Sequence, residues 1–333
     1  MSFLLNKRLA RSLWRTKIRL VAVILMVVIG VFAGISMGGY ATNVSVLYDN
    51  IYEDSEDGVN LPDIWVNLPV GTWSDEESQN LCDKFEEDFS TESPSIDKCE
   101  PRLVVDGILY ALTNSGEEVL VTAVWHGIDE GEVDKVWIPN HDCCEGRIAQ
   151  TSAEIVIDAH VAEDLDISVG SSVSLGAGEG RMNFTVVGLG YHSNHFWFAP
   201  EGSLFPAEVG TYVTGYLTAE GLEKLANLTS GSSNKILIDL EGTPAFDLSS
   251  TDDFEGDEIS PVKAHLMEVL LAADSGTSTV NDRGETPSVE FLRADLEGAQ
   301  KSFPAVTVML AIVASITIIL SLQRLIQSQS REI

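Results

Sequence analysis

Residues 286–333 read TPSVEFLRADLEGAQKSFPAVTVMLAIVASITIILSLQRLIQSQSREI. The first part is amphipathic, because apolar residues recur at helical spacings at Leu292, Leu296, Ala299 and Phe303. An uncharged run of 18 residues follows at 305–322, which is long enough to cross a bilayer as a helix. The pattern therefore predicts a stalk helix at 286–303 that continues into a membrane span at 304–322.

The same stretch carries helix-start signals. Thr286 is a suitable capping residue, and Pro287 suits the first helical position. A single helix of this length would measure roughly 69 Å, about twice the hydrocarbon thickness of a bilayer. Pro304 lies where the helix would enter the bilayer, and a proline there can kink it. The span alone is explained by a plain membrane anchor, whereas one continuous rod is able to carry movement between the two sides.

A second apolar run, at 20–40, follows a basic N-terminus. Residues 1–19 contain six basic residues and no acid, and their leucines recur four apart. This pattern predicts a basic amphipathic helix on the cytoplasmic leaflet, or equally the ordinary basic flank of a membrane span. The apolar run exceeds a signal-peptide core and lacks a clear cleavage site, so a first transmembrane helix is favoured over a signal peptide.

Within that first apolar run, three glycines stand four residues apart: Gly30, Gly34 and Gly38. Small residues at this spacing form a flat stripe on which another helix can pack closely. Glycine is also common in membrane helices generally. We expect the stripe to be a packing surface.

The distribution of charge predicts the topology. Basic residues precede the first span, and Arg324 and Arg331 follow the second, so both termini are expected in the cytoplasm of a multi-pass plasma-membrane protein. Residues 41–303 are then extracytoplasmic. This segment holds 12 basic and 50 acidic residues, a net charge of 12 − 50 = −38. Such acidity disfavours nucleic acid as a partner, and it favours a high-salt setting or cationic ligands, with solubility alone as the plain alternative.

The extracytoplasmic segment is expected to fold as an α+β domain at 41–285. Alternating apolar residues predict eight strands, at 63–68, 102–112, 118–125, 154–158, 172–175, 183–187, 212–217 and 235–240. Capping residues and apolar periodicity predict four helices, at 74–89, 160–164, 218–228 and 260–273, with Glu77 completing a capping box at Ser74 and with Ser260 as the cap of the last. Strand–helix–strand patterns on both sides of a β-rich lobe, at about 126–210, indicate an inserted lobe.

Four cysteines in an exported domain favour disulfides. A bridge between Cys82 and Cys99 is preferred, but each of these can instead pair with Cys143 or Cys144, and sequence does not choose among the three connectivities.

Two histidine-containing stretches, His141 to Cys144 and His192 to His195, contain residue types that bind zinc. They lack the usual zinc spacings, so ordinary surface loops are favoured and no metal is expected. No catalytic or nucleotide-binding motif has its required context, so no active site is expected.

Two stretches resemble the MacB/FtsX family of ABC transporter permeases. Residues 154–188, EIVIDAHVAEDLDISVGSSVSLGAGEGRMNFTVVG, are similar to the family's extracytoplasmic core domain. Residues 321–333, SLQRLIQSQSREI, are similar to the cytoplasmic end of its second span. The basic N-terminal helix and the single span before a large outside domain match the family's layout.

The resemblance implies a non-enzymatic permease subunit. It would work with a cytoplasmic ABC ATPase that binds the ATP, and with a second permease subunit as a homo- or heterodimer. ATP hydrolysis would move the extracytoplasmic domain to export or extract a lipid, lipoprotein, peptide or drug. Arg324 and the ending Arg331, Glu332 and Ile333 would lie at the coupling end, 323–333.

Members of this family carry at least two further spans, so the resemblance implies a truncated form or fragment. The alternatives are a regulator of an envelope hydrolase that moves no cargo, and a two-span sensor or adhesion ectodomain.

Overall fold

The structure is a computed structural model. It describes the chain from Lys17 to Gln329 except for 53–58, 69–72, 90–93, 113–117, 129–132, 139–143, 193–198, 201–202, 204, 209, 243, 247, 249–256 and 274–277. The chain forms two compact units. One contains the chain up to Val46 and from Ala294 onward, and the other is Leu47–Arg293.

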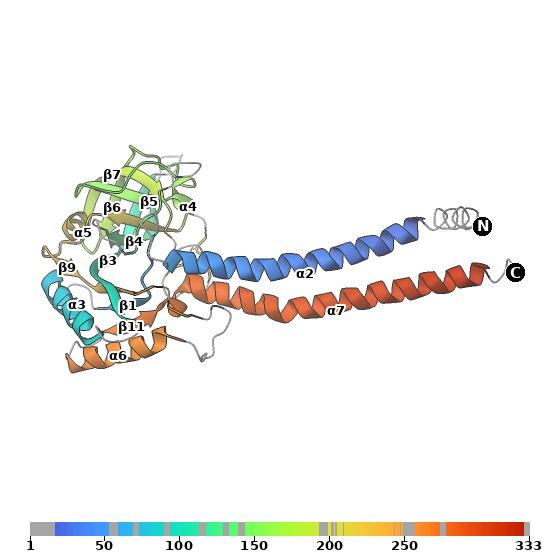
Figure 1. Ribbon diagram of the computed structural model, residues 1–333. Helices are drawn as coiled ribbons and strands as arrows, with labels where there is room; N and C mark the ends of the chain where they lie inside the picture. The colour runs from blue at the N-terminus through green and yellow to red at the C-terminus, as the bar shows by residue number, and fades with distance from the viewer. Residues whose placement is uncertain are drawn as a thin grey trace. The chain divides into compact units, whose positions relative to one another are not determined.

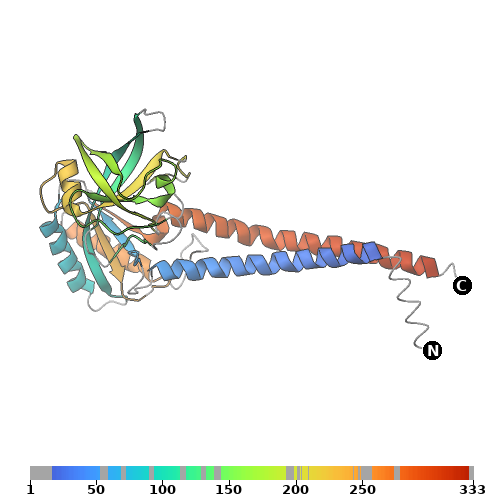
Figure 2. The ribbon, with the colours of Figure 1, turned by 90° about the horizontal axis from the view of Figure 1, so that it is seen from above.

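The first unit is built from two long helices, α2 (Lys17–Tyr52) and α7 (Pro287–Gln329), which lie side by side (Figures 1 and 2). In this unit the Tyr40 hydroxyl donates a hydrogen bond of 2.8 Å to Asp295 Oδ2. Pro304 lies inside α7, which continues through it. Among the described residues, one helix is long and apolar enough to cross a membrane, at Pro287–Leu320, and Val27–Ser36 is a shorter apolar stretch.

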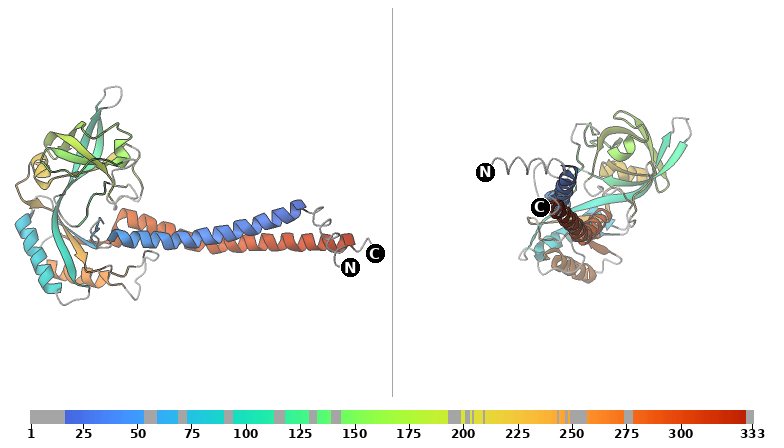
Figure 3. Two further views of the ribbon diagram at one scale, coloured as in Figure 1. Left: turned by 45° about the horizontal axis from the view of Figure 1, so that its top comes forward. Right: turned by 90° about the vertical axis from the view of Figure 1, so that its right-hand side faces the viewer.

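The second unit is a mixed α/β domain (Figure 3). Its strands are β1 (Ile64–Asn67), β2 (Trp73–Ser74), β3 (Ile96–Leu112), β4 (Glu118–Gly127), β5 (Glu154–Asp158), β6 (Ser172–Ala177), β7 (Gly180–Gly190), β8 (Tyr212–Leu217), β9 (Ser232–Ser233), β10 (Lys235–Leu240) and β11 (Thr279–Asp282). Its helices are α3 (Asp75–Phe89), α4 (Ala159–Ala162), α5 (Ala219–Ala226), α6 (Ile259–Ala272) and the 3-10 turn η2 (Arg283–Glu285), together with the last turn of α2 and the first turns of α7.

Six strands close into a barrel. They pair in the order β3-β4-β8-β5-β7-β6, and β6 pairs again with β3. Trp125 fills the interior, where its indole Nε1 donates 2.9 Å to the Gly176 carbonyl. A Cβ at Gly107 would lie 1.9 Å from that indole, and one at Gly215 would lie 2.6 Å from it. The absence of side chains at these two positions is what makes room for the tryptophan.

The remaining large strands form an antiparallel sheet in the order β11-β1-β10-β3. It shares β3 with the barrel: residues 96–102 pair with β10, and residues 103–112 pair with β4. The apolar residues of β1 and β10 pack with α3 and α6 in one core. Strand β3 is therefore the continuous element that joins the sheet to the barrel.

Most elements match the sequence-based expectations, and the differences concern strand bounds, helix caps and short elements such as β11. The Ser74–Glu77 capping box is present, with reciprocal bonds of 2.9 and 3.3 Å. Ser260 does not cap α6, because the helix starts one residue earlier and the Asp257 carboxylate accepts from Ile259 N at 2.9 Å.

At the start of α7, the Thr286 carbonyl accepts from Glu290 N at 2.9 Å, and its hydroxyl donates to the Arg283 carbonyl at 3.1 Å. The β-rich lobe extends on both sides of 126–210, because the barrel uses β3 and β4 before that range and β8 after it.

Candidate functional site: the Arg283 joint

The α/β unit contains a buried cluster where the last turn of α2 meets the segment that leads into α7. We call Tyr48, Tyr52, Asp63, Phe246 and Arg283 the Arg283 joint. Arg283 is fully buried, at 0% exposure, which is rare for a guanidinium and requires compensating contacts. The cluster therefore ties both chain ends of the unit to its β-sheet.

Arg283 is held by one carboxylate, one carbonyl and three aromatic rings. Its Nη1 lies 3.4 Å from Asp63 Oδ1, and its Nη2 donates 2.5 Å to the Pro244 carbonyl. The guanidinium carbon lies 4.7 Å from the Tyr52 ring centre, 4.8 Å from that of Phe246 and 5.6 Å from that of Tyr48. Such cation–π contacts stabilise a desolvated guanidinium.

The partner carboxylate, Asp63, connects the joint to the sheet. Its Oδ2 accepts from Leu240 N at 3.0 Å, and its carbonyl accepts from Arg283 N at 3.0 Å. Burial raises the pKa of Asp63 to about 6, although the Arg283 charge and the Leu240 N–H act in the opposite direction. The strand-end carboxylate is thus sensitive to the position of Arg283.

The aromatic side of the joint comes from α2. Tyr48 and Tyr52 are one turn apart, with ring centres at 4.9 Å, and Tyr48 stacks on Phe246 at 5.9 Å. Burial raises the pKa of both tyrosines, so both hydroxyls are neutral near neutral pH. The end of α2 is therefore fixed by ring packing around a cation.

The segment that leads into α7 is fixed from α6. Lys263 Nζ bonds to Asp282 Oδ2 at 2.9 Å and to Glu285 Oε2 at 2.6 Å. These two carboxylates also form the capping box of η2. Burial acts to lower the pKa of Lys263, but the bonds to Glu285 and Asp282 outweigh it and raise the pKa. Arg293, two turns into α7, stacks on Phe246 at 5.0 Å, so the start of α7 is held at several points.

A second buried polar cluster lies where β3 passes from the sheet into the barrel. Asp134 lies 3.2 Å from Arg102 Nη1 and 2.5 Å from His192 Nε2. Burial acts to raise the pKa of Asp134, but the charges of His192, Arg102 and His126 outweigh it and hold the pKa well below its usual range. The cluster connects β3, the loop after β4 and the end of β7.

That junction is reinforced by an amide. Asn234 donates from Nδ2 to the Val104 carbonyl at 2.9 Å and accepts from Val104 N at 2.7 Å. The segment after α2 is joined to the same place, because Asp134 N donates to the Asn60 carbonyl at 2.6 Å. The barrel, the sheet and the segment at Asn60 thus meet at one polar junction.

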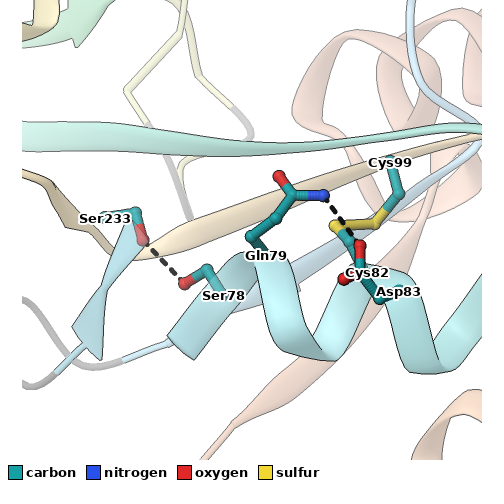
Figure 4. Close-up of a disulfide and its surroundings, with 6 residues drawn as sticks. All are labelled: Ser78, Gln79, Cys82, Asp83, Cys99 and Ser233. Carbon is teal, nitrogen blue, oxygen red and sulfur yellow. Dashed lines mark hydrogen bonds between the residues drawn. A yellow bond between two sulfur atoms is a disulfide. The ribbon is translucent and has the colours of Figure 1, made fainter. Parts of the chain in front are cut away.

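The structure joins Cys82 of α3 to Cys99 of β3, with Cα atoms 5.5 Å apart (Figure 4). This is the pairing that the sequence favoured. Beside it, the hydroxyls of Ser78 and Ser233 lie 2.6 Å apart. Cys144 is also disulfide-bonded, and Cys143 lies outside the described residues.

The glycine stripe is placed only in part. A Cβ at Gly30 would lie 3.9 Å from Leu310 Cβ of α7, whereas nothing lies within 4 Å of one at Gly34. The surroundings of Gly38 lie outside the described part of the structure. The role of the glycine stripe as a packing surface therefore stays a prediction.

Several other sequence predictions fall outside the described residues. Arg324 lies in α7, while Arg331, Glu332 and Ile333 are not described, and neither is the basic helix before residue 17. Of the proposed zinc-type residues, His141 and His195 also lie outside. Within the described residues, no group of three or more His, Cys, Asp or Glu side chains is arranged to hold a metal.

Sequence reasoning missed the Arg283 joint. The available signals were a lone arginine in Asp282-Arg283-Gly284-Glu285, directly before the predicted stalk, and two tyrosines four residues apart at the end of the first long helix. Neither signal indicates burial, because the partners come from opposite ends of the unit.

No family model and no curated protein matches the chain. Two solved structures are similar to it at low identity. The periplasmic region of MacB from Actinobacillus actinomycetemcomitans is 11% identical with a TM-score of 0.37, over 71% of this chain and 92% of that one. The extracellular domain of the noncanonic ABC-type transporter YknZ from Gram-positive bacteria is 12% identical with a TM-score of 0.37, over 66% of this chain and 99% of that one.

Proposed function

We propose that this chain is a non-catalytic permease subunit of an ABC-type complex. A separate cytoplasmic ATPase binds and hydrolyses ATP, and the chain passes the resulting movement to an extracytoplasmic domain. The cargo class is a lipid, lipoprotein, peptide or drug. A second permease subunit completes the pair, and α2 and α7 both cross the plasma membrane with their far ends in the cytoplasm.

The observation that carries this proposal is the Arg283 joint. Within the α/β unit, the last turn of α2 and the entry to α7 are tied to one buried guanidinium. The same cluster reaches β1 through Asp63 and β10 through Leu240. A displacement of either helix end would therefore reach the sheet through these buried contacts.

The length of α7 supports the same role. Its 43 residues form one helix, which at 1.5 Å per residue measures about 65 Å, roughly twice the bilayer core. A plain anchor requires neither this extra length nor a rigid attachment at its outer end. The resemblance of 154–188 and 321–333 to the MacB/FtsX permeases favours an ABC ATPase as the source of movement.

Purification of the full chain from its native cells in a mild detergent tests the proposal. The expected result is an ABC ATPase in near-stoichiometric amount, whose ATP hydrolysis rate changes when the chain is present. A topology assay with cysteine labelling at exposed sites of α5 should find the α/β unit outside. A chain that copurifies with no ATPase, or an α/β unit labelled only from the cytoplasm, would contradict the proposal.

A further inference from the structure

Helix α6 has an outward face that is unusual for this acidic domain. Its inward face packs in the sheet core through Val262, Leu266 and Val269. On the outward face, Met267 is 46% exposed and Leu271, one turn later, is 78% exposed. The other exposed positions of α6 are Ser260, Pro261, Ala264, Glu268 and Ala272, so only one charge lies among them.

The neighbouring helix on the same sheet is the opposite in character. The exposed positions of α3 are all polar, and they include seven carboxylates and a single lysine: Asp75, Glu76, Glu77, Asp83, Glu86, Glu87, Asp88 and Lys84. The two helices meet at Phe89 and His265, whose ring centres are 4.4 Å apart. The acids at 86–88 therefore lie within one turn of the contact with α6.

An exposed apolar stripe next to a strongly acidic helix indicates what would cover it. Met267 and Leu271 lie one turn apart, with Ala264 and Ala272 among the other exposed positions, so they form one apolar stripe. A contiguous apolar stripe rimmed by polar residues marks a contact site, unlike a single exposed leucine. A second copy of this chain would bring another α3 with seven carboxylates to the same place, and like charges oppose that contact. Anionic lipid headgroups are disfavoured for the same reason. A segment with apolar residues on one side and lysine or arginine on the other would cover the apolar stripe of α6 and pair with the carboxylates of α3.

We propose that the outer face of α6 with the acidic face of α3 is a docking surface for a basic amphipathic helix of a partner protein. Met267 and Leu271, which are one helical turn apart, would pack against the apolar face of the partner helix. The α3 carboxylates would face the lysine and arginine side chains of that helix. The surface lies on the α/β unit alone, so this proposal is independent of the proposed ABC-type role and is tested separately from it.

A labelled peptide of about five helical turns, made of leucine and lysine in amphipathic order, is a suitable probe. Its binding to the full chain in phosphatidylcholine nanodiscs is measured by fluorescence anisotropy, with empty nanodiscs as the blank. The variants are Leu271→Glu and, as a matched control, Leu120→Glu. Leu120 on β4 is 61% exposed, so both variants replace an exposed leucine by the same charge at different places.

We expect Leu271→Glu to weaken binding about tenfold or more, because a largely exposed leucine would otherwise be buried in the complex. Leu120→Glu should change binding less than about twofold. Hydrogen exchange should slow in α6 when the peptide is present, and Glu86→Gln with Glu87→Gln should reduce the salt dependence of binding.

Three results would overturn the proposal. Equal effects of the two leucine variants would mean that only net charge attracts the peptide. Slowed exchange elsewhere, with α6 unchanged, would place the surface on another face. A dimer of the chain that Leu271→Glu dissociates in sedimentation would make a second copy the occupant of α6.

Discussion

Replacing Arg283 with methionine should lower the free energy of unfolding of the α/β unit by about 3–5 kcal/mol near neutral pH, the usual cost of breaking a buried ion pair. Arg283 is 0% exposed and lies 3.4 Å from Asp63, so its removal leaves a buried carboxylate without its cation. For a unit of this size the change corresponds to a melting temperature lower by about 6–20 °C.

The matched control is Arg181→Met. Arg181 also stacks on a ring, with its guanidinium carbon 3.6 Å from the Tyr110 ring centre, and it also pairs with a carboxylate, Glu118, at 2.5 Å. Both side chains of that pair are about half exposed, at 47% and 48%. Because exposed pairs contribute about 0–1 kcal/mol, this variant should be nearly neutral.

The pH dependence of the Arg283→Met variant provides a sharper test. Burial raises the pKa of Asp63 from 3.8 to about 6, so its contribution to stability is present below about pH 4 and is lost as pH rises through about 6. Without Arg283 the ionised form of Asp63 is still less favourable in the folded state. The loss of unfolding free energy in the variant, relative to the parent chain, should therefore become smaller as the pH is lowered from about 8 to about 5.

Thermal unfolding followed by circular dichroism measures both effects. The double variant Asp63→Asn with Arg283→Met should recover about 1–3 kcal/mol relative to Arg283→Met, because no buried charge is then left unpaired. Two results would refute the reasoning: a loss no larger than that of Arg181→Met, or a double variant less stable than Arg283→Met at every pH.

Three further predictions concern the same unit. Replacing Cys82 and Cys99 together by alanine should lower the free energy of unfolding by about 3 kcal/mol, measured by denaturant titration. Because both cysteines are buried, mild reductant should not release their thiols before the unit unfolds. Asp134→Asn should cost about 3–5 kcal/mol, because it leaves the buried Arg102 with only the more distant carboxylate of Glu100, at 3.6 Å. Because the pKa of Asp134 lies below its usual range, the stability that Asp134 contributes is present above about pH 4 and is lost as pH falls further. Residues 41–303 carry a net charge of −38, so raising KCl from about 0.1 M to about 1 M should raise the melting temperature by screening repulsion, with equal osmolarity of sucrose as the control.

The sequence predicted the elements whose cause is local. The uncharged run at 305–322 predicted α7, and period-two alternation predicted β5 and β10. The sequence did not predict the N-terminal part of β3, residues 96–101, because Glu100 and Pro101 interrupt the alternation of apolar and polar residues. Proline is tolerated there because only β10 pairs with that part of β3, which leaves it at a sheet edge.

Features that depend on distant parts of the chain were not predictable in this way. The barrel closes because residues 107–110 of β3 pair with residues 174–177 of β6, and nothing local specifies that pairing. Likewise, Tyr48 and Tyr52, which cover part of the buried Arg283, reach it from the other end of the α/β unit. The composition of Asp282-Arg283-Gly284-Glu285 by itself indicates a solvated turn.

We infer that ATP hydrolysis at a separate subunit reaches the α/β unit through the Arg283 joint. Hydrogen exchange of the copurified complex, with and without hydrolysable ATP, measures this most directly in peptides covering 59–66 and 280–293. We predict that ATP changes exchange in both peptides, and that Arg283→Met reduces the change in 59–66 while ATP hydrolysis continues. Identical exchange with and without ATP, in a complex that hydrolyses it, would contradict the account.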